Sequence, residues 1–309
     1  MPSVRVNGLD IAYESSGRAS NPAILLIHGL ATPLTGWRES MVDGLVQQGF
    51  RVVLFDNRDI GLSTHLADAG FPDLKAMIDK VKAGQPLAPP YTLEDMAADA
   101  AGLLDALRID SAHIVGASMG GMIAQLVALR HPRKARSLVS IMSTTARPGL
   151  PQAKSEAMRA MMAMPASPSR EDRLATAIAA VRAVCGPGFP ASDEELRDYL
   201  GRSIDRTPFD PAGAARQMAA IIAARPRNAA LNALAVPALV IHGADDPLMP
   251  VEHGRDTAAS IPGAKLAIVP GMGHEFGEAL TPVYVREIGG FVEAVEAARR
   301  LQAERQAAQ

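Results

Sequence analysis

Short runs of apolar residues alternate along this chain with longer stretches in which apolar residues recur every three or four positions. The runs are apolar at every position rather than at every second one, which is typical of strands covered on both faces in a parallel sheet. The longer stretches are typical of amphipathic helices. The alternation therefore predicts an α/β fold. The expected strands are residues 23–27, 51–55, 113–115, 137–141, 237–241 and 265–269.

Three further patterns extend this arrangement. Asn7-Gly8 separates two short alternating segments between Met1 and about Tyr13, which predicts an antiparallel hairpin at the sheet edge. Thr92 with an acid three positions later is close to a capping box and predicts a crossover helix. A long terminal helix is expected from about Thr281, with the polar residues 301–309 frayed.

The strand pattern is interrupted between residues 143 and 232. This segment is rich in Ala, Met, Arg and Pro and shows helical periodicity without a convincing strand. It predicts a helical cap, with residues 1–142 and 233–309 forming the core. The connection 64–90 is long, and we expect it to contribute to a pocket wall. The helical stretches of the cap are expected near residues 154–164, 171–184, 193–203 and 212–224.

Composition and charge narrow the class of protein. The 309 residues are 48% hydrophobic and carry a formal net charge of −2, without a basic cluster or a run of eighteen apolar residues. We therefore expect a soluble protein with a small-molecule partner, and neither nucleic acid nor membrane as a partner. Cys185 is the single cysteine and has no partner for an internal disulfide. The first residues do not show a secretory signal, so a cytoplasmic location is expected.

Ser118 stands in the strongest chemical motif of the chain. Gly116-Ala117-Ser118-Met119-Gly120 directly follows the expected strand 113–115 and directly precedes a helical pattern. Glycines two positions before and after a serine leave room for a sharp strand-to-helix turn, which projects the hydroxyl at the carboxyl edge of the sheet. The motif predicts a nucleophilic serine; the alternative is a serine that only caps the helix.

A serine nucleophile needs a base that is itself oriented by a carboxylate. His274 follows the last expected strand in a glycine-containing loop and is the best candidate for the base. Asp245 and Asp246 both follow the strand 237–241, between the serine and the histidine in chain order. Pro247 restricts the backbone of Asp246, which is a weak argument for that residue, and the residues alone leave both aspartates open.

Backbone amides must also stabilise the charge on the carbonyl oxygen of the substrate. The amide of Met119, directly after the serine, is one candidate, and the amide of Leu30 in the His28-Gly29 loop is the other. Trp37 is expected either to line the pocket or to anchor the helix that follows it. For the methionines of the cap (Met158, Met161, Met162 and Met164), helix packing is a more common role than forming a roof over the substrate.

In their order along the chain, these motifs resemble those of the α/β-hydrolase superfamily. The resemblance covers essentially the whole chain. The sequence DNRDIGLS at residues 56–63 and PGMGH at residues 270–274 are similar to the capped esterase branch that includes the aclacinomycin methylesterase type. The resemblance implies a mostly parallel eight-stranded sheet flanked by helices, with the helical cap inserted after strand 6. It also implies that Asp246, which precedes a proline, is the acid, and that the amides of Leu30 and Met119 form the oxyanion hole. We expect Arg58 to be a scaffold residue that pairs with Asp56 or Asp59.

The sequence thus predicts a serine hydrolase that cleaves a carboxylic ester through an acyl-enzyme, with Ser118, His274 and Asp246 as the triad. It predicts no cofactor and no metal. The same triad would serve a lactonase, an amidase or aminopeptidase, a carbon–carbon bond hydrolase or a perhydrolase, and a hydrolase-shaped ligand sensor is a further alternative. The substrate stays open, as does the oligomeric state, for which a homodimer is one option.

Overall fold

Eight strands form one sheet in the computed structural model of the chain, which describes residues 1–307. Their order is β1-β2-β4-β3-β5-β6-β7-β8; β2 is antiparallel to β1 and β4, and the other pairs are parallel. The predicted mostly parallel sheet is therefore confirmed. The strands are β1 (Ser3–Val6), β2 (Leu9–Ser16), β3 (Ala23–Ile27), β4 (Arg51–Phe55), β5 (Ala112–Ala117), β6 (Ala135–Ile141), β7 (Ala238–Gly243) and β8 (Lys265–Val269).

Helices cover both faces of this sheet, which explains why β3, β5 and β7 are buried at every position. On one face, α3 (Leu93–Ala106) and α4 (Met119–Arg130) pack in one apolar cluster. On the other face, α1 (Glu39–Gln47) and α11 (Thr281–Ala307) pack in a second cluster. The predicted cap of α3 is confirmed, because the side chains of Thr92 and Asp95 bond each other's backbone N–H groups as a full capping box.

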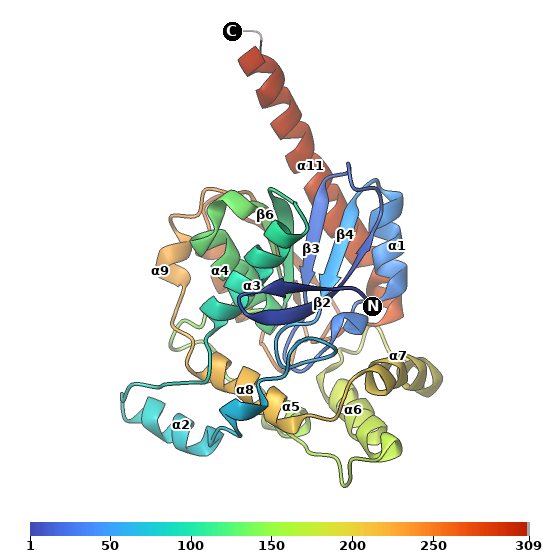
Figure 1. The fold of residues 1–309 in the computed structure, drawn as a ribbon, viewed down its shortest axis with the longest axis vertical. Helices are drawn as coiled ribbons and strands as arrows, with labels where there is room; N and C mark the ends of the chain where they lie inside the picture. Colours follow the sequence, from blue (N-terminus) through green and yellow to red (C-terminus); the bar gives the residue numbers. More distant parts are fainter. Residues whose placement is uncertain (308–309) are drawn as a thin grey trace.

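Between β6 and β7 the chain forms helices only, and we name residues 143–232 the cap segment. The helices between residues 155 and 222 lie beyond the carboxyl ends of the parallel strands, whereas the short helix at Asn228–Leu231 lies beside the core helix α4 (Figure 1). In the preceding connection, α2 (Leu74–Lys82) lies beside α8. The cap helices are α5 (Ser155–Met161), α6 (Arg170–Val184), α7 (Asp193–Arg206), α8 (Pro211–Ile222) and α9 (Asn228–Leu231). The remaining helix is α10 (Glu252–Ala259), and short 3-10 turns occur at Leu34–Gly36, Ala67–Ala69, Pro132–Lys134 and Glu278–Leu280.

The end of α11 projects away from the rest of the molecule, on the side opposite the cap segment (Figure 1). The expectation that the chain frays from residue 301 is wrong as far as Ala307, because the helix continues to that residue with exposed side chains. Residues 308 and 309, the last two that were expected to fray, lie outside the described residues. None of the helices formed by residues 1–307 combines the length and apolar character that a membrane crossing needs.

Candidate active site

Ser118 occupies a sharp turn between β5 and α4. Its backbone angles are φ 55° and ψ −121°, outside the regions that L-residues ordinarily occupy. The flanking glycines make this turn feasible, because a Cβ on Gly116 would lie 2.0 Å from the carbonyl oxygen of Gly120, and one on Gly120 would lie 2.0 Å from that of Ile27. The geometry is that of a nucleophile elbow, with Ser118 at the N-terminus of a helix.

His274 lies in the loop after β8, and its Nδ1 is 2.8 Å from Oδ2 of Asp246. The other oxygen of Asp246 accepts hydrogen bonds from the backbone N–H groups of Leu248 and Met249. Burial alone would raise the pKa of Asp246, but His274 and these backbone donors outweigh burial, and the pKa lies below its ordinary value. A buried carboxylate thus fixes the orientation of the imidazole.

Asp245 makes different contacts from its neighbour. Its Oδ2 accepts a hydrogen bond of 2.9 Å from the backbone N–H of Gly271, and its own N–H donates to the carbonyl of Met272. Asp245 is exposed, whereas the side chain of Asp246 is fully buried. Of the two aspartates that the residues alone left open, the structure brings Asp246 to His274, and Asp245 fastens the histidine loop.

Ser118 and His274 line the same cavity, although no hydrogen bond joins their side chains within residues 1–307. Such bonds are often long in an enzyme without substrate. The cavity also exposes Cys185, but burial raises the pKa of this thiol, so the thiol stays protonated. The hydroxyl of Ser118, beside an oriented imidazole, is thus better placed for nucleophilic attack than the thiol.

The two backbone amides that were expected to hold an oxyanion belong to segments that meet this serine. Leu30 lines the cavity, and Met119 is the first residue of α4. In the described part of the chain, neither N–H has a hydrogen-bond acceptor. A Cβ on Gly29 would lie 3.1 Å from the Cβ of Ser118, which shows how closely the loop approaches the serine. Both amides are therefore free to donate to a ligand atom beside Ser118.

The cavity has a volume of about 620 Å³ and lies between the strand ends and the cap segment. Phe71 and Leu74, from the connection 64–90, also line it, so this connection forms part of the wall as expected. Met161, Met162 and Met164 line the cavity, and Met164 is 61% exposed; these residues form part of the roof rather than a helix core. Met158 lines a different, smaller cavity. The other apolar residues of the roof include Ala177, Val181, Leu196, Leu200, Ile204, Phe209 and Met218.

The arginines that line the cavity are engaged with the protein. Arg38 is buried and donates to the carboxylate of Glu195 at 2.8 Å and to the carbonyl of Phe276. Arg173 donates to the carbonyl of Thr207 at 3.0 Å. Arg38 is thus paired with a carboxylate, whereas Arg173, whose acceptor is a neutral carbonyl, has no ion-pair partner among the described residues.

Trp37 does not line the cavity and is 3% exposed. Its ring makes edge contacts with His28 and Phe276, with 4.9 Å between centroids in each pair. Of its two expected roles, the structure therefore favours anchoring. Burial lowers the pKa of His28 to about 4, so this histidine is neutral at the start of the loop that carries Leu30.

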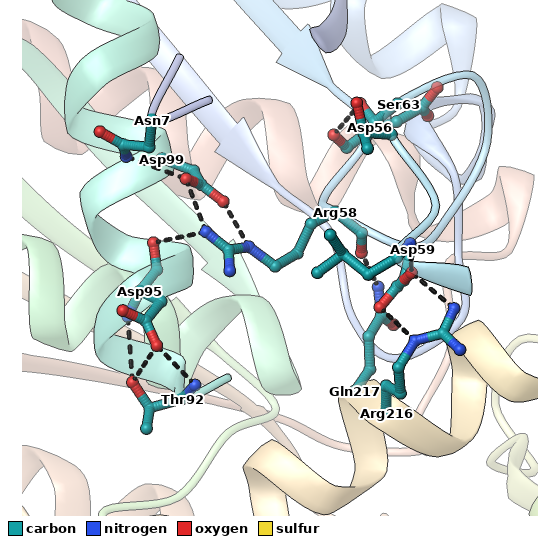
Figure 2. A network of polar contacts seen from close by, with 12 residues as sticks. Asn7, Asp56, Arg58, Asp59, Ser63, Thr92, Asp95, Asp99, Arg216 and Gln217 are labelled. Atoms are coloured by element: carbon teal, nitrogen blue, oxygen red, sulfur yellow. Dashed lines mark hydrogen bonds and ion pairs between the residues drawn. The ribbon is translucent and has the colours of Figure 1, made fainter. Parts of the chain in front are cut away.

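Arg58 is a scaffold residue as expected, but its expected partners are wrong. Its guanidinium forms two hydrogen bonds, of 2.7 and 2.8 Å, with Asp99 on α3 (Figure 2). Asp56 and Asp59 do not pair with it because they bind arginines of the cap segment. Asp56 contacts Arg206 at 2.7 Å, and Asp59 contacts Arg216 at 2.7 and 2.8 Å. The hydrophobic periodicity of the sequence did not indicate the contacts of Asp56 and Asp59 with the arginines of the cap, which join residues about 150 positions apart.

One cluster within residues 1–307 has the ligand types of a metal site. Asp59, His65 and Asp210 each place one ligand atom within 4.8 Å of the others. The guanidinium of Arg216 already donates to both carboxylates, and Nδ1 of His65 lies 2.6 Å from Asp210. Arg216 thus supplies the positive charge that a metal ion would bring, and the cluster is a contact between core and cap.

The family model for the alpha/beta hydrolase fold matches residues 22–278 of the chain. The chain belongs to the α/β-hydrolase family. This match spans the serine elbow, the aspartate loop and the histidine loop, so the resemblance inferred from the motifs is confirmed. The hydrolase fold and the relatives below support a hydrolase.

Relatives of this α/β-hydrolase carry several activities in their names. Rhodomycin D methylesterase of Streptomyces peucetius is 28% identical over 84% of this chain and 87% of its own length. The 3-oxoadipate enol-lactonase 2 of Acinetobacter baylyi is 25% identical over 79% of this chain and 78% of its own. A meta-cleavage product hydrolase from Pseudomonas fluorescens is similar in fold, with a TM-score of 0.70 and 20% identity over 95% of this chain and 98% of its own.

Proposed function

We propose that this α/β-hydrolase is a serine esterase that cleaves neutral carboxylic esters through an acyl-enzyme. The observation that carries the proposal is the placement of Ser118, in a strained elbow, on the same cavity as His274, whose imidazole is fixed by the buried Asp246. The named methylesterase relative supports the ester as the substrate class.

In the proposed mechanism, Oγ of Ser118 attacks the acyl carbon while Nε2 of His274 takes its proton. Asp246 stabilises the imidazolium that forms, and the N–H groups of Leu30 and Met119 stabilise the oxyanion. His274 then gives the proton to the leaving alcohol. Water attacks the acyl-enzyme by the same steps in reverse order, releasing the acid and restoring Ser118.

The walls of the cavity support a neutral substrate. A substrate carboxylate would be buried among mostly apolar side chains, and Arg38 is already paired with Glu195, which leaves Arg173 as the one arginine of the described lining without a carboxylate partner. Burying an unpaired charge costs several kcal/mol, whereas each buried methylene contributes roughly 0.8 kcal/mol. We therefore propose that the cap segment, residues 143–232, acts as a lid that selects apolar, uncharged esters.

Lactone hydrolysis is a second candidate, because a named relative is an enol-lactonase. A lactone is a cyclic ester and would use the same serine, histidine and amides. The two candidates differ in whether the leaving alcohol stays tethered to the acyl group, so competing substrates of each kind distinguish them.

The test is hydrolysis of p-nitrophenyl esters from acetate to palmitate, with the hemisuccinate as an anionic match for the neutral valerate and dihydrocoumarin as the lactone. A fluorophosphonate label located by mass spectrometry identifies the nucleophile. We expect turnover that rises with chain length, the label on Ser118, and at least a tenfold preference for valerate.

The outcomes distinguish an esterase, a lactonase and a ligand sensor. Loss of both turnover and label in Ser118→Ala supports the esterase, while better turnover of dihydrocoumarin than of any open ester favours a lactonase. Stoichiometric labelling without turnover on any substrate would indicate a sensor. Absence of label on Ser118 would remove the mechanism altogether.

A further inference from the structure

The loop that carries Leu30 is held at its two ends by the core. The carbonyl of His28 accepts a hydrogen bond from the side chain of Asn57, and the backbone N–H of Leu34 donates to Oδ1 of Asp56 at 2.7 Å. Both side chains come from the turn after β4. Residues that directly follow the carboxyl end of β4 therefore fix both ends of the loop.

The middle of the loop is held by the cap instead. The backbone N–H of Ala31 donates to Oε1 of Gln217, on α8, at 2.8 Å. Nε2 of the same side chain donates to the carbonyl of Arg58 at 2.7 Å, and Gln217 is fully buried. One amide thus bridges the loop beside Leu30 and the turn after β4, and Figure 2 shows the side chain of Gln217 reaching the backbone of Arg58.

Ala31 needs such a contact because its backbone is in the left-handed region, with φ 51°. A non-glycine residue in this region is strained, and its conformation persists where the surroundings fix it. Ala31 directly follows Leu30, so a change in its backbone would turn the neighbouring amide away from Ser118.

Helix α8 is itself fixed to the core at the adjacent position. Arg216 is 1% exposed and forms a two-bond ion pair with the buried Asp59. The rigid placement of α8 is what allows a side chain of the cap to determine the geometry of a core loop.

We propose that Gln217 is a positioning residue for the oxyanion site, so that the cap supplies part of the catalytic geometry as well as the roof of the cavity. The inference rests on the proposed function, because it assigns Gln217 a role through the amide of Leu30. In this role Gln217 contributes to stabilising the transition state, whereas the walls of the cavity bind the neutral substrate.

The test replaces Gln217 by methionine, which has nearly the same shape and neither hydrogen-bonding group. A matched control is Gln125→Met: Gln125 is equally buried, bonds Ser140, Thr144 and Arg227, and does not contact the loop. Both variants are compared with the unmodified chain. The kinetic measurements are kcat and KM for p-nitrophenyl butyrate and the inhibition constant of p-nitrophenyl butyl ether. The rate of fluorophosphonate labelling and Tm are measured as well.

We expect Gln217→Met to lower kcat and the labelling rate by about 10- to 100-fold, since both pass through a developing oxyanion. KM and the inhibition constant of the uncleavable ether should change by less than about threefold, and Gln125→Met should lower Tm with kcat retained.

The inference is overturned if Gln217→Met labels as fast as the unmodified chain, or if the inhibition constant of the ether worsens as much as kcat does. The second result would mean that the variant only disturbs the cap. If the unmodified chain does not label on Ser118, the proposed function has failed, and the inference fails with it.

Discussion

Ser118 and Asp246 follow buried parallel strands, whereas the methionines above them belong to a segment whose outer surface is exposed. The strand-end residues are positioned by backbone geometry: the elbow at Ser118 and the N–H groups that hold Asp246. The cap is positioned by side chains, chiefly arginine–aspartate pairs with the turn after β4. The floor of the cavity thus has a chemical arrangement fixed by the backbone, and the roof is lined mainly by apolar side chains.

The largest effect should come from removing the nucleophile in the floor. Ser118→Ala should lower kcat by about four orders of magnitude or more, because the acyl-enzyme no longer forms, while the circular dichroism spectrum stays unchanged. His274→Ala should lower kcat comparably. Steady-state hydrolysis of p-nitrophenyl butyrate measures both, and a variant that keeps a tenth of the activity would contradict the triad.

The two aspartates of the β7 loop should differ sharply. Asp246→Asn leaves the shape and removes the charge that stabilises the imidazolium, so we expect kcat to fall by about 10³- to 10⁴-fold. Asp245→Asn is the matched control and should cost less than about tenfold, since its side chain only accepts the N–H of Gly271. The reverse ranking in kcat would show that Asp245 is the acid.

The ion pair that holds the roof can be broken without replacing a residue of the triad. Arg216→Met leaves Asp59 buried without its partner, and the free energy of unfolding should fall by about 3–5 kcal/mol. Arg170→Met removes a similar two-bond pair with Asp205 that is more than half exposed, and should leave the free energy of unfolding nearly unchanged because solvent screens the pair. Urea unfolding measures both, and equal effects would contradict the buried clamp.

Acid should destabilise the core through its buried histidines. Burial lowers the pKa of His113 to about 4, as for His28, while an unfolded histidine has a pKa of about 6.5. The unfolded chain therefore binds more protons between these values, and stability falls as the pH decreases from 6.5 to 4, by about 3 kcal/mol for each histidine. His113→Gln should flatten the pH dependence of urea unfolding; an unchanged slope would rule out this role for His113.

The sequence predicted most of the floor because its signals are local. A serine between glycines after an apolar run specifies an elbow within five residues, and Pro247 marks the aspartate loop. Contacts between distant segments give no local signal: Arg58 pairs with Asp99 on α3 rather than with its neighbours in the turn, and Gln217 of the cap reaches a loop 186 residues away. Arg216-Gln217 is a polar pair within the largely apolar α8, and this was a signal available in the sequence. The pair does not indicate which residues it contacts.

The extension of α11 has a practical consequence. Its exposed last turns lie on the side of the molecule away from the cap helices α5 to α8 (Figure 1). A covalent attachment near residue 305 would therefore tether the molecule to a bead or a sensor chip with the cavity facing the solution. Immobilisation through this helix should preserve turnover, whereas coupling through the lysines of α2, beside the cavity wall, should hinder substrate entry.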